Sequence, residues 1–193
     1  MKERIHSILQ ESIRVKQSIL DDPAWQVKLA DAAEAWIDAL KGGGKVLFCG
    51  NGGSAADAQH LAAELSGRFY VDRDPLPAEA LHVNTSYLTA VANDYSYDEV
   101  YARMVKGMGR KGDVLVAIST SGNSSNILRA IEEARIRGMV VIGMTGDTGG
   151  KMAAVCDHLL NVPSSDTPRI QEVHILLGHI LCELTEARLF SPS

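Results

Sequence analysis

Short, continuous apolar runs alternate with helical patterns through the chain after residue 45. Continuous rather than alternating hydrophobicity indicates strands that are covered on both faces, which is typical of a parallel sheet between two layers of helices. The fold class that we expect is α/β, an open doubly wound parallel five-stranded sheet flanked by helices. The predicted strands are 46–49, 80–83, 114–118, 140–144 and 159–162.

Residues 1–41 have a purely helical pattern. Apolar positions recur near helical spacing, and Asp22 followed by Pro23 predicts the start of a second helix, which the glycines at 42–44 end. We therefore expect an N-terminal helical extension over 1–41, used in oligomer packing. The domain proper is expected over 42–193, and both parts are expected to form one structural unit.

The last predicted helix runs from about residue 168 to 188 and is apolar nearly all the way round. Such a helix is buried on several sides, and a small monomer has little with which to cover it. We expect the N-terminal helices and this long C-terminal helix to pack against partner subunits as a symmetric bundle. The alternative is that they cover each other within one subunit.

Composition narrows the class of protein. The 193 residues include 19 Lys and Arg against 24 Asp and Glu, a net charge of −5 without a basic block, which argues against a nucleic-acid partner. No apolar run is long enough for a bilayer, and the first residues lack the apolar segment of a signal peptide. The three cysteines form no C-x-x-C pair, which favours a reducing cytoplasm.

A glycine-rich segment, CGNGGSA at 49–55, follows the first predicted strand and precedes a helix. Glycines there let the backbone approach a ligand closely, and a helix N-terminus offers free N–H groups to an anion. The segment matches G-x-G-x-x-A, but no acidic residue ends the next strand to hold a ribose hydroxyl, which argues against a dinucleotide. A tight strand-to-helix turn is the alternative.

A second polar segment, STSGNS at 119–124, follows the third predicted strand. Its hydroxyl groups can donate to phosphate oxygens at a helix N-terminus, where the dipole also favours an anion. No Walker lysine follows, so a monophosphate is favoured over a nucleoside triphosphate. The alternative is a Ser/Thr-rich helix cap.

Two helices carry candidate chemical groups. His60 and Glu64 share one helix face, a spacing that suits a metal ion, a base with its orienting partner, or an exposed polar pair. Gln171 and His179 are eight residues apart on the last helix, so they meet one ligand only by reaching toward each other or by serving different subunits. His174 competes with them, and a satisfied core histidine is the alternative for each.

Asn93 and Asp94 precede a tyrosine-rich segment at 95–101. An Asn-Asp pair suits a helix N-cap, which is the plain interpretation. The alternative is part of a wall that binds a sugar.

GNGGS at 50–54 and STSGNS at 119–124, each on a strand-to-helix turn, together resemble the sugar isomerase (SIS) domain. Nearly the whole chain is similar, in the right order, to the bacterial phosphoheptose isomerase family. The further segments that carry this resemblance are AQHLAAELSGRF, ANDYSYDEVYAR, STSGNSSNI, MTGDTGGKMA and RIQEVHILLGHILCE.

The resemblance implies an aldose–ketose isomerase that converts D-sedoheptulose 7-phosphate to D-glycero-D-manno-heptose 7-phosphate through an enediol. It also implies a cytoplasmic homotetramer with active sites between subunits and one zinc ion per subunit. The implied metal ligands are His60, Glu64, Gln171 and His179. Glu64 is the implied base and His179 the implied acid. The implied substrate contacts are Asn51, Gly52, Gly53, Ser54, Glu64, Asn93, Asp94, Ser119, Thr120, Ser121, Ser124 and Gln171.

Two rival interpretations stay within the SIS domain. One is a non-enzymatic scaffold that binds the replication initiator; such a relative lacks the acidic and terminal histidine positions, whereas Glu64 and His179 are present here. The other is an isomerase of a different sugar phosphate, against which the chain length and the two residue pairs argue.

Overall fold

The computed structural model describes residues 1–190. Its elements are α1 (Lys2–Leu20), α2 (Pro23–Lys41), β1 (Val46–Gly50), α3 (Gly53–Ser66), β2 (Ala78–Ala80), α4 (Thr85–Asp94), η1 (Tyr97–Glu99), α5 (Val100–Met108), β3 (Val114–Ile118), α6 (Ser125–Ile136), β4 (Val140–Thr145), η2 (Gly150–Ala154), β5 (His158–Asn161) and α7 (Thr167–Phe190). In this part of the chain, no helix has the length and apolar character needed to cross a membrane.

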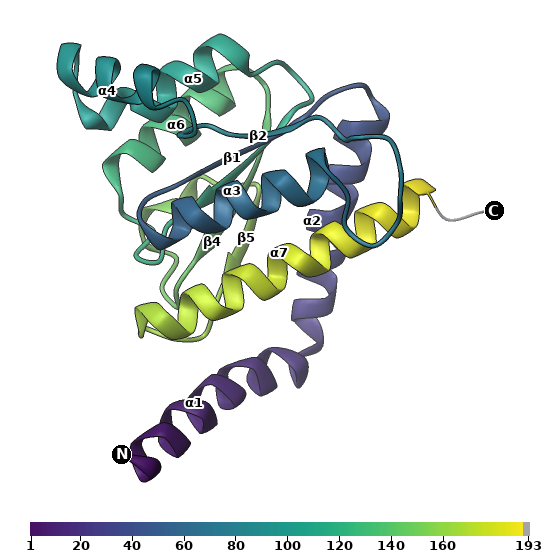
Figure 1. The fold of residues 1–193 in the computed structure, drawn as a ribbon, viewed down its shortest axis with the longest axis vertical. Coiled ribbons are helices and arrows are strands. Elements are labelled where there is room, and N and C mark those ends of the chain that lie inside the picture. The colour runs from purple at the N-terminus through teal and green to yellow at the C-terminus, as the bar shows by residue number, and fades with distance from the viewer. Residues whose placement is uncertain (191–193) are drawn as a thin grey trace.

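Five parallel strands form one sheet in the order β2-β1-β3-β4-β5, as expected from the apolar runs. The central strands are buried on both faces. Alternate residues face two separate cores, so that Phe48 lies in one and Leu47 in the other. Helices α2, α3 and α7 cover the first face, and α4, α5 and α6 cover the second (Figure 1).

The predicted strand at 80–83 is misplaced, because β2 spans Ala78–Ala80. β2 is an edge strand with one half-buried, one exposed and one buried residue, so it has no continuous apolar run. The run that suggested a strand instead turns toward α4, where the Asn84 side chain accepts a hydrogen bond from the Tyr87 N–H and caps that helix.

The predicted helix boundary near residue 22 is confirmed. Asp22 is the N-cap of α2, and its side chain accepts a hydrogen bond from the Ala24 N–H at 3.0 Å. The fully buried Trp36 of α2 packs edge-on against Phe48 of β1, with ring centroids 5.5 Å apart. This helix therefore contributes to the sheet's own core. The division into 1–41 and 42–193 stays a prediction, and residues 191–193 lie outside the described residues.

Helix α1 projects away from the body of the molecule (Figure 1). Val15 is its one buried residue within the described chain, whereas Ile5, Leu9 and Ile13 are 52%, 57% and 63% exposed. Most apolar residues of α7 are covered by this chain's own elements, so the single-subunit alternative holds for most of α7. The apolar stripe of α1 is not covered in this way.

His174 of α7 is a satisfied core histidine at one of its two nitrogens. It is fully buried, and its Nε2 donates to the Thr145 carbonyl at 3.1 Å. Burial lowers the pKa of His174 from its ordinary value of 6.5 to about 4, although the Thr145 hydrogen bond opposes that shift. The ring is therefore neutral at physiological pH, and it contributes to packing.

Replacing Trp36 by Ala should lower the free energy of unfolding by about 3–5 kcal/mol, because the cavity cannot fully collapse between α2 and the sheet. Val27→Ala on the same helix is the control, since Val27 is 61% exposed. That control should change the value by about 0.5 kcal/mol or less. Urea denaturation at fixed protein concentration measures both, and equal losses would mean that α2 is not part of the core.

Acid should destabilise the fold through His174. The unfolded chain binds a proton below pH 6.5 while the native ring stays neutral down to about pH 4, so stability falls as the pH falls through that window. The expected loss between pH 7 and pH 5 is about 2 kcal/mol. His174→Gln, which keeps an N–H donor, should remove this loss, whereas His6→Gln in the exposed part of α1 should retain it. Chemical denaturation at both pH values makes the comparison.

Candidate active site

The two polar loops lie side by side at the carboxyl edge of the sheet. β1 and β3 are neighbours with Gly50 opposite Ile118, so the loops that follow them meet there. The order β2-β1-β3-β4-β5 makes this gap the topological switch point, where open α/β sheets bind their ligands. Each loop is a predicted binding site, and the fold brings the two loops together at one edge of the sheet.

The glycine loop presents Asn51 in a fixed orientation. Its side-chain amide exchanges two hydrogen bonds of 2.9 Å with that of Asn126 on α6, and the Tyr97 hydroxyl donates to its Oδ1 at 3.4 Å. The Tyr101 hydroxyl donates to the Gly50 carbonyl and holds the end of β1. The glycine loop is therefore a tight turn that also holds the Asn51 side chain in one orientation.

In the serine loop, the hydroxyl group at the start of α6 does not cap that helix. Ser124 is the N-cap of α6, but its side chain forms no capping hydrogen bond. It lies 3.0 Å from the Ser119 hydroxyl, which is also 3.5 Å from that of Ser121. The capping alternative is therefore wrong for Ser124, and its hydroxyl stands beside the helix N-terminus where an anion would bind.

A second segment with glycines, at 144–153, packs against the serine loop. Gly122 has a φ of +64°, and a Cβ atom there would stand 2.1 Å from the Gly149 carbonyl oxygen. The Met152 N–H donates to the Gly122 carbonyl, and the Lys151 N–H donates to Asn123 Oδ1, both at 3.1 Å. Only a residue without a side chain fits at 122, and the same holds at Gly150, where a Cβ atom would stand 2.4 Å from the Ser121 carbonyl oxygen.

His60, Glu64 and His179 come together between α3 and α7. Their potential ligand atoms all lie within 4.8 Å of one another. His60 Nε2 is 3.0 Å from Glu64 Oε1, and the rings of His60 and His179 are 5.0 Å apart between centroids. The exposed-pair alternative for His60 and Glu64 is incomplete, because a third group joins them from another helix.

This cluster fits a metal ion. His179 Nε2 is buried and has no hydrogen-bond partner among the described residues, so its lone pair or proton is unpaired without a further ligand. Two imidazoles and one carboxylate are a typical protein donor set for zinc, with a fourth position left for another ligand. Three of the four predicted metal ligands therefore lie close enough together to share one ion.

Gln171 does not join the cluster within one chain. Its amide nitrogen lies only 2.5 Å from where a Cβ atom on Gly53 would stand, at the start of α3. His179 instead adjoins His60, farther along both helices, so α3 and α7 run parallel. The two side chains thus lie near different turns of α3, and their joint binding of one ligand stays a prediction.

The remaining predicted contacts differ in their surroundings. Ser54 is buried at the first turn of α3, whereas Gly52 and Gly53 are exposed and Thr120 is half-buried. Asn93 and Asp94 end α4, and the Asn93 amide donates to Asp94 at 2.9 Å. The N-cap interpretation of these two residues is therefore wrong. Their predicted contact with a sugar stays a prediction.

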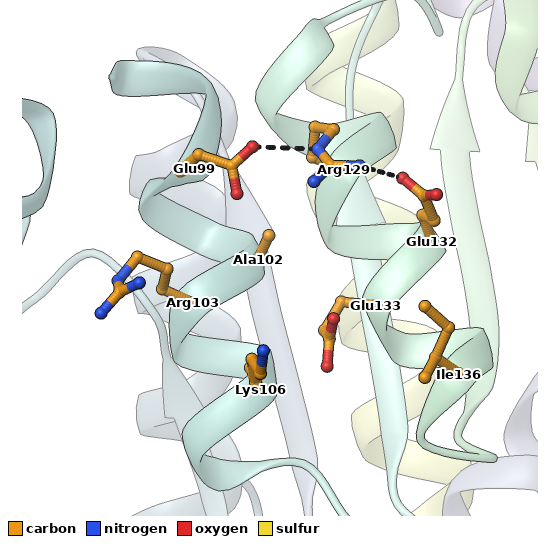
Figure 2. Close-up of a pocket in the computed structure, with 8 residues that line it drawn as sticks. All are labelled: Glu99, Ala102, Arg103, Lys106, Arg129, Glu132, Glu133 and Ile136. Carbon is orange, nitrogen blue, oxygen red and sulfur yellow. Dashed lines mark hydrogen bonds and ion pairs between the residues drawn. The ribbon is translucent and has the colours of Figure 1, made fainter. Parts of the chain in front are cut away.

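A hollow of about 190 Å³ lies elsewhere, between α5 and α6 (Figure 2). Arg129 lines it and pairs with Glu99 and with Glu132, so charges of both signs neutralise each other there. None of the predicted site residues lines it. It is separate from the candidate active site.

Asn126, Tyr97 and Tyr101 fix the glycine loop, and the sequence pattern does not predict this role for them. Asn126 lies two residues after the serine loop, but its partner is on a different strand-to-helix turn, so local spacing carries no signal of the contact. For the two tyrosines, the sequence pattern offers only the alternative of a wall that binds a sugar.

The SIS domain family model matches residues 12–146. A phosphoheptose isomerase of Rhodospirillum rubrum is 61% identical over 163 residues, which are 84% of this chain and 87% of that protein. One of Mycobacterium tuberculosis is 54% identical over 189 residues, or 96% of this chain and 94% of that protein. The solved phosphoheptose isomerase from Neisseria gonorrhoeae matches with a TM-score of 0.90 and 48% identity, covering 96% of this chain and 98% of that one. The chain therefore belongs to the phosphoheptose isomerase family of SIS-domain enzymes.

Proposed function

We propose that the protein interconverts D-sedoheptulose 7-phosphate and D-glycero-D-manno-heptose 7-phosphate in the cytoplasm. The product would feed nucleotide-activated heptose for lipopolysaccharide or capsule synthesis. The relatives named phosphoheptose isomerase support this assignment. The observation that carries it is the meeting of Glu64 and His179, from two separate helices, in one cluster.

The reaction needs a base and an acid on neighbouring atoms. The Glu64 carboxylate takes a proton from C1 of the ketose, and the carbonyl oxygen on C2 becomes the second hydroxyl of a cis-enediol. His179 protonates or polarises that oxygen. Return of the proton to C2, with loss of the O1 proton, gives the aldose. The ligand atoms of both side chains lie within 4.8 Å, which suits adjacent carbons.

The serine loop anchors the substrate at its other end. Ser119, Ser121 and Ser124 have neighbouring hydroxyls beside the N-terminus of α6, a suitable place for the 7-phosphate. Binding energy from this remote group positions the reacting carbons. Asn51, held by Asn126, is suited to a hydroxyl in the middle of the sugar.

Distance along α3 supports an active site between subunits. Glu64 comes eleven residues after Gly53, which is roughly 16 Å of helical rise. Eight bonds separate C1 of the sugar from its phosphorus atom. If these bonds are as extended as those of a polypeptide backbone, they span only roughly 10 Å. A sugar phosphate anchored at the turn before α3 would not span this rise, and we propose that a neighbouring copy supplies the serine loop in a homotetramer. The exposed apolar stripe of α1 offers a surface for that assembly.

The same assembly accounts for the fourth predicted metal ligand. Gln171 lies beside the glycine loop, so it would reach a cluster of His60, Glu64 and His179 from another copy. We propose zinc as the ion, one per subunit, because the donor set suits it. When bound, zinc would supply a Lewis acid beside the oxygens on which negative charge develops.

Glu64→Gln should reduce kcat by roughly 100-fold or more, because the amide cannot accept the C1 proton. Folding and binding of the phosphate group should be retained, since the serine loop is untouched. The assay follows formation of the aldose from sedoheptulose 7-phosphate, and Glu132→Gln on the far side of α6 is the control. Near-normal turnover by the Glu64 variant would show that another group is the base.

His60→Ala should remove the metal from the purified protein, since one of two imidazole ligands is lost. Elemental analysis of protein prepared without chelators should find about one zinc per chain before the substitution and much less after it. His174→Gln serves as the control, because His174 bonds to the Thr145 carbonyl instead of joining the cluster. Undiminished zinc in His60→Ala would rule out this ligand set.

A further inference from the structure

A buried ion pair joins the ends of the two helices that carry the cluster. Arg73, in the segment after α3, donates through Nε to Glu186 Oε1 on α7 at 2.7 Å. The two side chains are only 2% and 3% exposed. Neither residue has a role in the chemistry proposed above, and Glu186 lies about two helical turns beyond His179.

Glu186 fixes the backbone that follows α3. Its carboxylate accepts hydrogen bonds from the N–H groups of Phe69, Tyr70 and Val71 at 3.2, 2.7 and 2.9 Å. The first of these residues places its ring against the His179 imidazole, with centroids 5.6 Å apart. The carboxylate therefore acts on His179 through the aromatic ring that packs against it.

Arg73 fixes the other half of the cluster. Its guanidinium donates to the carbonyl oxygens of Glu64 and Leu65, each at 3.0 Å, and so satisfies the last turn of α3. The backbone of the proposed base is thus held by the partner of Glu186. The Phe190 ring covers the guanidinium at 5.3 Å and helps to exclude water.

Glu186 stays ionised in this environment. Burial would raise the pKa of Glu186, but the hydrogen bonds from Val71, Tyr70, Arg73 and Phe69 together lower it below its ordinary value. A charged acceptor of four hydrogen bonds is more rigid than a neutral one, because charge-assisted hydrogen bonds are shorter and stronger.

We propose that Arg73 and Glu186 are positioning residues that hold Glu64 and His179 at their working separation. This inference rests on the proposed isomerase function for its kinetic test. Replacing a buried ion pair by apolar residues is often neutral for stability, so fold stability alone does not account for two desolvated charges here. Their contacts instead converge on the backbone of one cluster residue and on the ring that packs against another.

The kinetic test uses Glu186→Gln, with Glu183→Gln as the matched control. Glu183 is an exposed acid one turn earlier on α7 and forms no hydrogen bond or ion pair within residues 1–190. For Glu186→Gln we expect kcat to fall roughly 10- to 100-fold. KM should stay within a factor of about three, because the substitution leaves the serine loop unchanged. The control should match the unsubstituted protein in both constants.

A metal titration tests the same inference without turnover. Apo-protein is titrated with Co²⁺, whose visible absorption reports the ligand geometry. Glu186→Gln should bind Co²⁺ roughly 10- to 100-fold more weakly, with a weaker absorption band. Glu183→Gln should be unchanged. If the unsubstituted protein binds Co²⁺ but does not isomerise the heptose phosphate, the proposed function fails while this titration still tests the positioning role.

Unchanged Co²⁺ affinity and kcat in a folded Glu186→Gln variant would overturn the inference, even if its melting temperature fell. Circular dichroism checks the fold. Should that variant not fold, Phe69→Leu decides, since it removes the ring from His179 and leaves the ion pair in place. A several-fold loss of Co²⁺ affinity is expected there. An unchanged affinity would contradict the inference equally.

Discussion

The close parallel packing of α3 against α7 determines the candidate active site. Gly178 makes it possible, because a Cβ atom there would stand 2.5 Å from the Leu61 methyl groups. With the helix backbones this near, His179 reaches the face of α3 that presents His60 and Glu64. A larger residue at 178 would crowd the buried Leu61 side chain at this contact between the two helices.

The same packing separates two kinds of chemistry along one pair of helices. Their N-terminal ends lie near the carboxyl edge of the sheet, where Gln171 adjoins Gly53 and the loop after β1 lies beside the serine loop. The other ends carry imidazoles and a carboxylate, held by Arg73 and Glu186. In the proposed tetramer, each substrate lies between the first region of one copy and the second region of another.

Most of the fold follows from local patterns. β1, β3 and β4 are apolar on both faces, so their runs were visible, and the Asp22 cap and the glycines at 42–44 mark the limits of α2. The bounds of β2 were predicted wrongly, because an edge strand needs little apolar surface and so has no continuous apolar run. Within the site, the residue types at 60, 64, 119 and 124 carried their own signal, since hydroxyls and metal ligands are recognisable by spacing.

Contacts between distant segments could not be predicted in this way. Gln171 and His179 are both polar residues in an apolar helix, so the sequence pattern does not distinguish them. The direction of α3 relative to α7 determines that Gln171 lies beside Gly53 and His179 beside His60. Arg73 and Glu186 are 113 residues apart and look like ordinary surface charges until the loop after α3 folds over α7. Asn51 and Asn126 likewise depend on β1 lying beside β3.

The separation of the serine loop from the His60–Glu64–His179 cluster has a genetic consequence under the proposed assembly. A chain with a damaged loop still carries an intact cluster, and a chain with a damaged cluster still carries an intact loop. Two such alleles expressed together would form mixed oligomers in which some sites combine the two sound halves. Complementation between individually inactive alleles is therefore a natural property of this architecture.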